Sequence, residues 1–286
     1  MTGGAANILE EISSKTRERI AVRRREIPLS EVRAQAEDAC AHGDDEGCGG
    51  KSFIKALRKQ GMSYICEVKK ASPSKGIIAE HFPYLDIARR YEEAGASAIS
   101  CLTEPFYFQG SDKYLKEITS EVAIPVLRKD FTVDEYMIYE AKLLGASAVL
   151  LICSILGSEQ LNEYLALTES LGMDALVEAH DADEVDTAVK AGAHIIGVNN
   201  RDLKTFEIDM HNSINLRNLA PDSVIFVSES GIRTKEDIKI LYDNRVDAVL
   251  IGETLMRSEN KKEALERLNG GPLAAGHESG KRGEQR

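Results

Sequence analysis

Short apolar runs alternate with longer amphipathic segments from Tyr64 to Leu255. The runs are almost continuously apolar rather than alternating, which is typical of parallel strands that are buried on both faces. They predict eight strands, at Tyr64–Lys70, Ala96–Leu102, Ile124–Asp130, Ala146–Ile152, Asp174–His180, Ala193–Asn200, Ser223–Ser230 and Val246–Gly252.

The segments between the runs have helical spacing. Tyr84, Ile87, Ala88 and Tyr91 fall at positions i, i+3, i+4 and i+7, which line one face of a helix. Glycine stands after several of these segments, as at Gly95, where helices commonly end. Strand and helix repeated eight times predict a (β/α)₈ barrel of the α/β class. A doubly wound open sheet is the alternative, and the lack of a Gly-rich dinucleotide turn disfavours it.

The first residues differ from the repeating part. Ile8–Arg25 reads as a charged amphipathic helix, Ala41–Gly50 as a polar, glycine-rich loop and Phe53–Leu57 as a short helix. This part is small for a core of its own. The predicted organisation is a helical extension packed on the barrel (1–62), the barrel itself (63–268) and a disordered, polar tail (269–286).

Composition and charge narrow the class of protein. The chain has 286 residues, of which 43% are hydrophobic and 29% charged, with a net charge of −11. This is the mixture of a globular protein, and the acidic balance disfavours nucleic acid or an anionic membrane as partner. No window approaches the roughly 18 apolar residues of a membrane span, and the first residues do not read as a secretory signal. Five cysteines without a CxxC pair predict reduced thiols and a cytoplasmic location.

Charged residues stand at the carboxyl ends of the predicted strands, where a (β/α)₈ barrel has its active site. Glu67 and Lys69 are two residues apart and therefore point the same way. With Lys129 and Glu178, they predict a cluster whose burial would be costly if it served stability alone. Salt bridges inside the barrel are the alternative interpretation.

Other strand ends add polar side chains. His180 is either a site residue or a hydrogen-bonded residue at the rim. The other polar residues at these ends, which strand alternation divides between the two faces, are Arg128, Asp130, Asn199, Asn200, Arg201, Ser228, Glu229, Ser230 and Glu253.

The last two strand ends predict a phosphate site. Ser230-Gly231 ends one strand and Gly252-Glu253 ends the next, just before an apparent helix. Glycine lets backbone N–H groups approach an anion closely, and many barrels bind phosphate at this place. Two ordinary tight turns are the alternative. The loop Ala71–Gly76 carries hydroxyls and a cation and is able to close over the same phosphate.

Motifs of other enzyme classes are missing from the sequence. The six histidines show no HxH or HExxH spacing, so no metal site is expected. Neither a nucleophile elbow nor a P-loop is present.

The motifs together resemble the indole-3-glycerol-phosphate synthase family of tryptophan biosynthesis. The segments that carry the resemblance are Ile65–Gly76, Leu102–Ser111, Pro125–Phe131, Leu176–Asp181, Ile196–Phe206, Ser228–Ile232 and Ile251–Met256. The first of them, with the pattern E-x-K-x-x-S-P-S, is the most specific. The resemblance implies a carbon–carbon lyase, a decarboxylase that needs no cofactor and no metal. Its substrate would be 1-(2-carboxyphenylamino)-1-deoxyribulose 5-phosphate, closed to indole-3-glycerol phosphate with loss of carbon dioxide and water.

The resemblance also implies roles for individual residues. Lys129 would be the general acid on the ketone oxygen. Lys69 would bind the anthranilate carboxylate and donate a proton in the dehydration, and Glu67 would position it. Glu178 would be a base or an electrostatic partner; which glutamate is the working base stays open. The implied catalytic set is Glu67, Lys69, Lys129, Glu178, Asn199 and Ser230. The implied binding set is Ser72, Phe108, Phe131, Arg201, Glu229, Gly231, Gly252 and Glu253, with the two phenylalanines against the aromatic ring.

Two other functions remain as alternatives. One is a different phosphate-binding barrel enzyme, such as a sugar-phosphate isomerase. The pair Lys69 and Lys129 disfavours it, because enolisation chiefly needs one base and one acid. The other is a barrel that serves as a non-enzymatic scaffold, which the charges at five strand ends disfavour. The expected partner is a phosphorylated small molecule, and the expected state is a monomer or a weak homo-oligomer.

Overall fold

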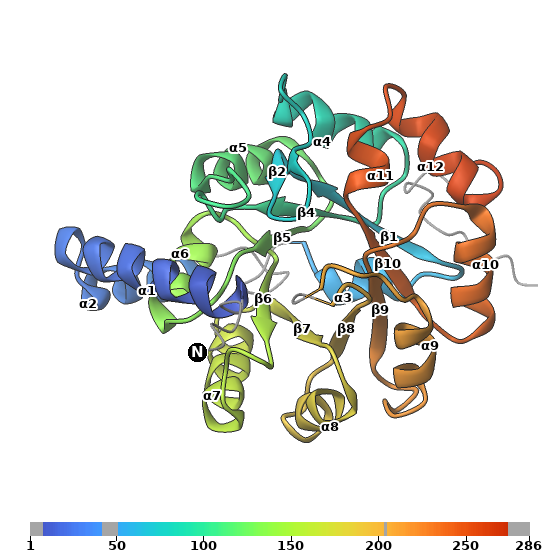
Figure 1. Ribbon diagram of the computed structural model, residues 1–286. Coiled ribbons are helices and arrows are strands. Elements are labelled where there is room, and N and C mark those ends of the chain that lie inside the picture. Colours follow the sequence, from blue (N-terminus) through green and yellow to red (C-terminus); the bar gives the residue numbers. More distant parts are fainter. Residues whose placement is uncertain (1–7, 42–50, 203–204, 274–286) are drawn as a thin grey trace, which may run out of the picture.

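The computed structural model describes residues 8–41, 51–202 and 205–273 and contains a closed barrel of eight parallel strands (Figure 1). The strands are β1 (Ser63–Val68), β4 (Ala98–Leu102), β5 (Val126–Lys129), β6 (Ala148–Ile152), β7 (Asp174–Ala179), β8 (Ile195–Asn199), β9 (Ile225–Glu229) and β10 (Ala248–Ile251). The ring closes because β1 pairs in parallel with both β4 and β10. The predicted (β/α)₈ barrel is confirmed, and the open-sheet alternative is wrong.

Helices surround this ring (Figure 1). They are α4 (Tyr84–Glu93), α5 (Asp112–Glu121), α6 (Glu135–Leu143), α7 (Ser158–Ser170), α8 (Ala182–Lys190), α9 (His211–Arg217), α10 (Lys235–Asp243), α11 (Glu253–Met256) and α12 (Lys261–Asn269). Local sequence fixes where several begin. Asp134 and Asp181 accept hydrogen bonds from backbone N–H groups at the starts of α6 and α8, and Thr234 forms a capping box with Asp237 on α10.

The strands separate two apolar cores. On β1, Cys66 and Val68 point outward into the core between strands and helices, whereas Ile65 belongs to a second core inside the barrel. Since side chains alternate along a strand, Glu67 lies on the same inward face as Ile65. Glu67 therefore points into the barrel, and Val68 points away from it.

Three helices precede the barrel: α1 (Ile8–Glu26), α2 (Leu29–Ala41) and α3 (Phe53–Leu57). The first two lie beside α6 (Figure 1). The sequence did not predict α2, which buries only Val32 and Ala36 and so carries a weak apolar stripe. The predicted loop Ala41–Gly50 and most of the predicted tail fall on residues 42–50 and 274–286, outside the described residues.

Helix α3 lies under the barrel, at the amino ends of the strands. Its Phe53 and Leu57 are fully buried in the inner core. The backbone N–H of Ile54 donates to the carboxylate of Asp174, the first residue of β7. The amino end of the barrel is thus covered by an apolar layer.

A small hairpin of β2 (Ala71–Ser72) and β3 (Gly76–Ile77) stands at the opposite end, directly after β1. It was read from the sequence as a loop only. In the described ranges, no helix is both long and apolar enough to cross a membrane.

Candidate active site

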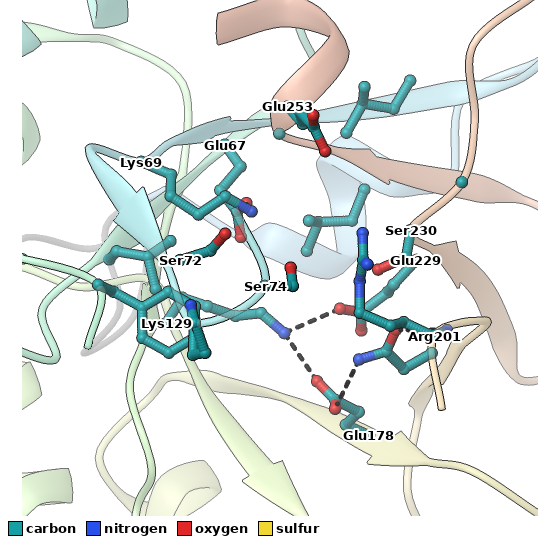
Figure 2. Close-up of a pocket in the computed structure, with 18 of the residues that line it drawn as sticks. Glu67, Lys69, Ser72, Ser74, Lys129, Glu178, Arg201, Glu229, Ser230 and Glu253 are labelled. Carbon is teal, nitrogen blue, oxygen red and sulfur yellow. Dashed lines mark hydrogen bonds and ion pairs between the residues drawn. The ribbon is translucent and has the colours of Figure 1, made fainter. Parts of the chain in front are cut away.

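A pocket of about 450 Å³ opens at the carboxyl ends of the strands. It brings together the catalytic residues implied by the sequence, namely Glu67, Lys69, Lys129, Glu178, Asn199 and Ser230. It is also lined by all eight implied binding residues, Ser72, Phe108, Phe131, Arg201, Glu229, Gly231, Gly252 and Glu253. Figure 2 labels ten of the residues that line this pocket. The chain therefore gathers at one mouth the groups that the sequence placed at separate strand ends.

Lys129, the last residue of β5, lies at the centre of the pocket. Its Nζ donates to Glu178 Oε2 on β7 and to Glu229 Oε2 on β9, each at 2.8 Å (Figure 2). Burial works to lower the pKa of Lys129, but the two carboxylates outweigh it and hold the pKa above its usual range. Lys129 is therefore an ammonium group at neutral pH, charged and able to donate a proton.

The two carboxylates beside Lys129 have different surroundings. Glu178 also accepts from Asn199 Nδ2 at 3.3 Å and lies 3.4 Å from His180 Nε2. Burial works to raise the pKa of Glu178, but Lys129 and His180 together hold it below its usual range. In Glu229, burial and the neighbouring Glu178 charge prevail over Lys129 and raise the pKa to about 7. The second oxygen of Glu229, Oε1, is buried without a hydrogen-bond partner.

His180 lies behind Glu178 and does not line the pocket. Its ring contacts Glu178 and, through Nδ1 at 3.0 Å, Glu184. Burial works to lower the pKa of His180, but the two carboxylates raise it to about 10. Of the two readings of His180, the hydrogen-bonded rim residue is the one that the structure shows.

Lys69 and Glu67 form a second charged pair on β1 and just after it. The ammonium of Lys69 contacts the Glu67 carboxylate directly. Both side chains are largely buried, and both point into the pocket (Figure 2). Lys129 with its carboxylates and Lys69 with Glu67 are thus two separate sets of acid and base groups that face one cavity.

One end of the pocket is apolar. The rings of Phe108 and Phe131 lie 6.2 Å apart, with 40° between their planes. Ile8, Leu9 and Ile12 of α1 complete this wall. Sequence reasoning missed these three residues, because nothing local to a helix that begins more than fifty residues before β1 shows which part of the barrel it covers.

The other end is polar and rich in glycine. Ser230 and Gly231 both have positive φ, 69° and 87°, so the chain turns sharply there. Gly252 and Glu253 follow β10, and Ser72 approaches from the hairpin. Arg233, Arg257 and Ser74 also line the pocket and were not singled out from the sequence. The backbone of these turns and the arginine cations at this end suit an anion.

Several strand-end candidates point elsewhere. Arg128 faces outward, is fully buried and donates to Asp112 at 2.8 Å and to Glu140 at 2.6 Å. Asn200 and Ser228 bond each other at 2.9 Å behind the barrel wall. These residues differ in parity from Lys129, Asn199 and Glu229, so strand alternation turns them away from the pocket, and they do not line it.

Asp130 lies at the pocket edge, with its carboxylate accepting from Arg19 of α1 at 2.9 Å and from Thr103 at 2.7 Å. Within the described ranges, no three His, Cys, Asp or Glu side chains gather in a way that could hold a metal ion.

Comparison of the sequence with known proteins gives one consistent result. The family model described as indole-3-glycerol phosphate synthase matches residues 9–268. A protein of that name from Ruminiclostridium cellulolyticum is 52% identical over 263 residues, covering 92% of this chain and 99% of the relative. Another, from Endomicrobium trichonymphae, is 60% identical over 217 residues, covering 76% of this chain and 84% of the relative.

Solved structures support the fold. A structure of KGPDC from Streptococcus mutans has a TM-score of 0.58 at 12% identity, covering 74% of this chain and 97% of that one. A chain of the tryptophan synthase complex from Pyrococcus furiosus has a TM-score of 0.55 at 13% identity, covering 73% and 98%. At such identities the likeness concerns the fold alone, whereas the family match and the relatives establish that this chain belongs to the indole-3-glycerol phosphate synthase family.

Proposed function

We propose that the pocket catalyses the ring closure of 1-(2-carboxyphenylamino)-1-deoxyribulose 5-phosphate to indole-3-glycerol phosphate, with release of carbon dioxide and water. The observation that carries this assignment is the position of Lys129. Its ammonium lies between Glu178 and Glu229, in the pocket that has an aromatic wall at one end and a glycine-rich turn at the other. A substrate with an aryl group, a ketone and a phosphate in that order matches this sequence of surfaces.

Ring closure begins when the aromatic carbon that carries the carboxylate attacks the ketone carbon. A carbon–carbon bond forms, and the carbonyl electron pair moves to oxygen. The Lys129 ammonium delivers a proton to that oxygen, which converts the developing alkoxide to a hydroxyl. Glu178 and Glu229 keep Lys129 charged until the substrate oxygen replaces one of them as hydrogen-bond acceptor.

Loss of carbon dioxide then returns the bonding electrons to the ring. Loss of water needs a proton on the departing hydroxyl and removal of a proton from the ring carbon or nitrogen. Lys69 is the acid that we assign to this step, and Glu67, which contacts Lys69, positions it and accepts protons. Glu178 is the second base, with Asn199 holding its other oxygen. Ser230 follows Glu229 in the chain and lines the same pocket, where we assign it a contact with the substrate.

Binding uses the two ends of the pocket. Phe108 and Phe131 pack on the anthranilate ring, and Lys69 also pairs with its carboxylate before it leaves. The phosphate is held by the backbone at Gly231, Gly252 and Glu253 and by the hydroxyl of Ser72, with Arg201 nearby. Because the whole chain is strongly acidic, these local donors must overcome an unfavourable overall field.

The purified protein tests this directly. With the carboxyphenylamino substrate, we expect indole fluorescence to appear with turnover, and with Lys129→Met we expect it to disappear while the far-UV circular dichroism stays unchanged. Phosphoribosylanthranilate serves as the second substrate. Turnover of that compound, without ring closure of the first, would favour the sugar-phosphate isomerase instead. No turnover of either would favour a scaffold.

A further inference from the structure

Two glycines stand at inward-facing positions beside the catalytic carboxylates. Gly197 lies on β8, next to β9, which carries Glu229. Gly252 follows β10, next to β1, which carries Glu67. Neither has a φ in the left-handed region, so the backbone does not by itself require glycine at either position.

Side-chain space explains why no larger residue fits. A Cβ added to Gly197 would overlap Glu229 Oε1 and lie 3.1 Å from Leu176 Cδ1. A Cβ added to Gly252 would overlap Glu67 Oε2 and lie 2.8 Å from Lys69 Nζ. In both places the hollow left by glycine is filled by the carboxylate of the neighbouring strand.

The hollow at Gly197 determines how Glu229 meets Lys129. In the register of β8 and β9, Glu229 stands opposite Asn199, whereas Gly197 stands opposite Val227. The Glu229 side chain therefore bends along the barrel axis, from the level of Asn199 to the level of Gly197. There its carboxylate packs against Gly197. From there its Oε2 accepts from Lys129 at 2.8 Å, while Oε1 faces the glycine with no hydrogen-bond partner.

We propose that Gly197 is a positioning residue: its missing side chain seats the Glu229 carboxylate, so that Lys129 is held between two carboxylates. Gly252 does the same for Glu67 and Lys69. Gly197 acts through Glu229 and does not touch the substrate. The inference rests on the proposed role of Lys129 as the acid, and it adds that the geometry of this acid depends on a position without a side chain on β8, three strands away from β5.

The first test is Gly197→Ala. The overlapping atom is the far end of a flexible side chain, so we expect the protein to fold and the carboxylate to move. A displacement of about 1 Å predicts a kcat lower by about 10²-fold, with KM for the carboxyphenylamino substrate changed by less than about threefold. Gly157→Ala is the matched control, because an added Cβ there meets nothing within 4 Å and its φ of −66° suits alanine. We expect its kcat to stay within about twofold of the parent.

A double-mutant cycle separates this role from ordinary packing. In a Glu229→Ala background there is no carboxylate to displace, so we expect Gly197→Ala to change kcat by less than about threefold there. An equal loss in both backgrounds would place the effect on Leu176 and overturn the proposal. So would full activity of Gly197→Ala alone.

Folding gives the same decision if Gly197→Ala is insoluble. Rescue of folding by Glu229→Ala supports the proposal that Gly197 positions the Glu229 carboxylate, whereas rescue only by Leu176→Val contradicts it. Lys129→Met keeps this outcome apart from the proposed function. If that variant is inactive and Gly197→Ala is fully active, the proposed role of Lys129 is retained and only the positioning role of Gly197 is wrong.

Discussion

Lys129 and Arg128 are neighbours in the chain, both largely buried and both hydrogen-bonded to two carboxylates, yet they belong to different parts of the molecule. Arg128 points outward, and all three of its nitrogens donate, to Asp112, Glu140, Thr103 and the carbonyl of Met137. Burial works to lower its pKa, but the carboxylates hold the pKa above its usual range. Lys129 points inward to a pocket and donates there to Glu178 and Glu229.

The comparison shows what separates a structural ion cluster from a reactive one. Both have the same kinds of group at similar distances and burial. Around Arg128, every polar nitrogen is used, and the cation cannot lose a proton. Around Lys129, the cation carries a removable proton and borders a cavity of substrate size. Access to a cavity and a removable proton distinguish the site, rather than charge or burial.

The largest expected effect is on turnover. Lys129→Met removes the proton donor, and we expect kcat to fall by about 10³-fold or more, as for loss of a general acid. Indole fluorescence in a continuous assay measures the loss, and a thermal melt close to that of the parent shows that the protein is folded. Near-normal turnover would remove Lys129 from the chemistry.

Arg128→Met is the matched change on the outer face. It removes the buried cation of Asp112 and Glu140 and leaves them only the half-exposed Arg23 of α1, so we expect the free energy of unfolding to fall by about 3 kcal/mol. Urea denaturation measures it. In the fraction that stays folded at low temperature, turnover per folded molecule is expected to change little. A large loss there would show that the two clusters are coupled.

Glu229→Gln tests the raised pKa of Glu229. Burial and Glu178 raise this pKa from 4.5 to about 7, so the ionised carboxylate costs stability. The cost is absent below pH 4.5, grows as the pH rises to about 7 and is constant above that. The variant carries no such charge. Its free energy of unfolding relative to the parent is therefore expected to rise between pH 5 and pH 8, by about 2 kcal/mol.

Denaturation of both proteins across this pH range is the measurement. The groups that face Glu229 are Lys129 on β5, Glu178 on β7 and Glu67 on β1. Of these, Glu178 has its pKa held low and stays ionised throughout the range. A difference between the proteins that does not change with pH would contradict the raised pKa.

The smallest effects concern the attachment of α1 and α2. Arg19 of α1 donates to the fully buried carboxylate of Asp130, and the same helix supplies Ile8, Leu9 and Ile12 to the pocket. Arg19→Met is expected to cost about 1 kcal/mol and to raise KM by about threefold. Arg33→Met breaks a half-exposed pair with Glu135 on the same side of the barrel, and should change stability by less than about 0.5 kcal/mol. If Arg19→Met and Arg33→Met changed KM equally, the position of α1 would have no specific role in substrate binding.

Much of the fold was readable in the sequence because each strand of a parallel barrel is buried on both faces and each ends at the same rim. Lys129 and Glu178 were placed by that rule alone. Arg128 stands at the same strand end as Lys129, and alternation along β5 turns the two side chains to opposite faces. The strands of the barrel therefore follow from the pattern of apolar residues. Which side chains point inward follows from that pattern together with the parity of each position along its strand.

Other features depend on contacts that no periodicity contains. The place of Ile8, Leu9 and Ile12 follows from how α1 docks through its arginines. The bridging position of Glu229 follows from a bend of its side chain onto Gly197, on another strand. Neither a motif nor a local pattern signals a missing side chain that matters only because of its neighbour.

The apolar layer that α3 forms under the barrel has a consequence for substrate entry and product release. Phe53 and Leu57 make the lower end a floor, so the described pocket is reached from above. Substrate arrives, and carbon dioxide, water and the indole product depart, through the same doorway. A large product still held by its phosphate stands in the path of the next substrate. Strong product inhibition, competitive with substrate, is the expected kinetic signature of such a blind chamber.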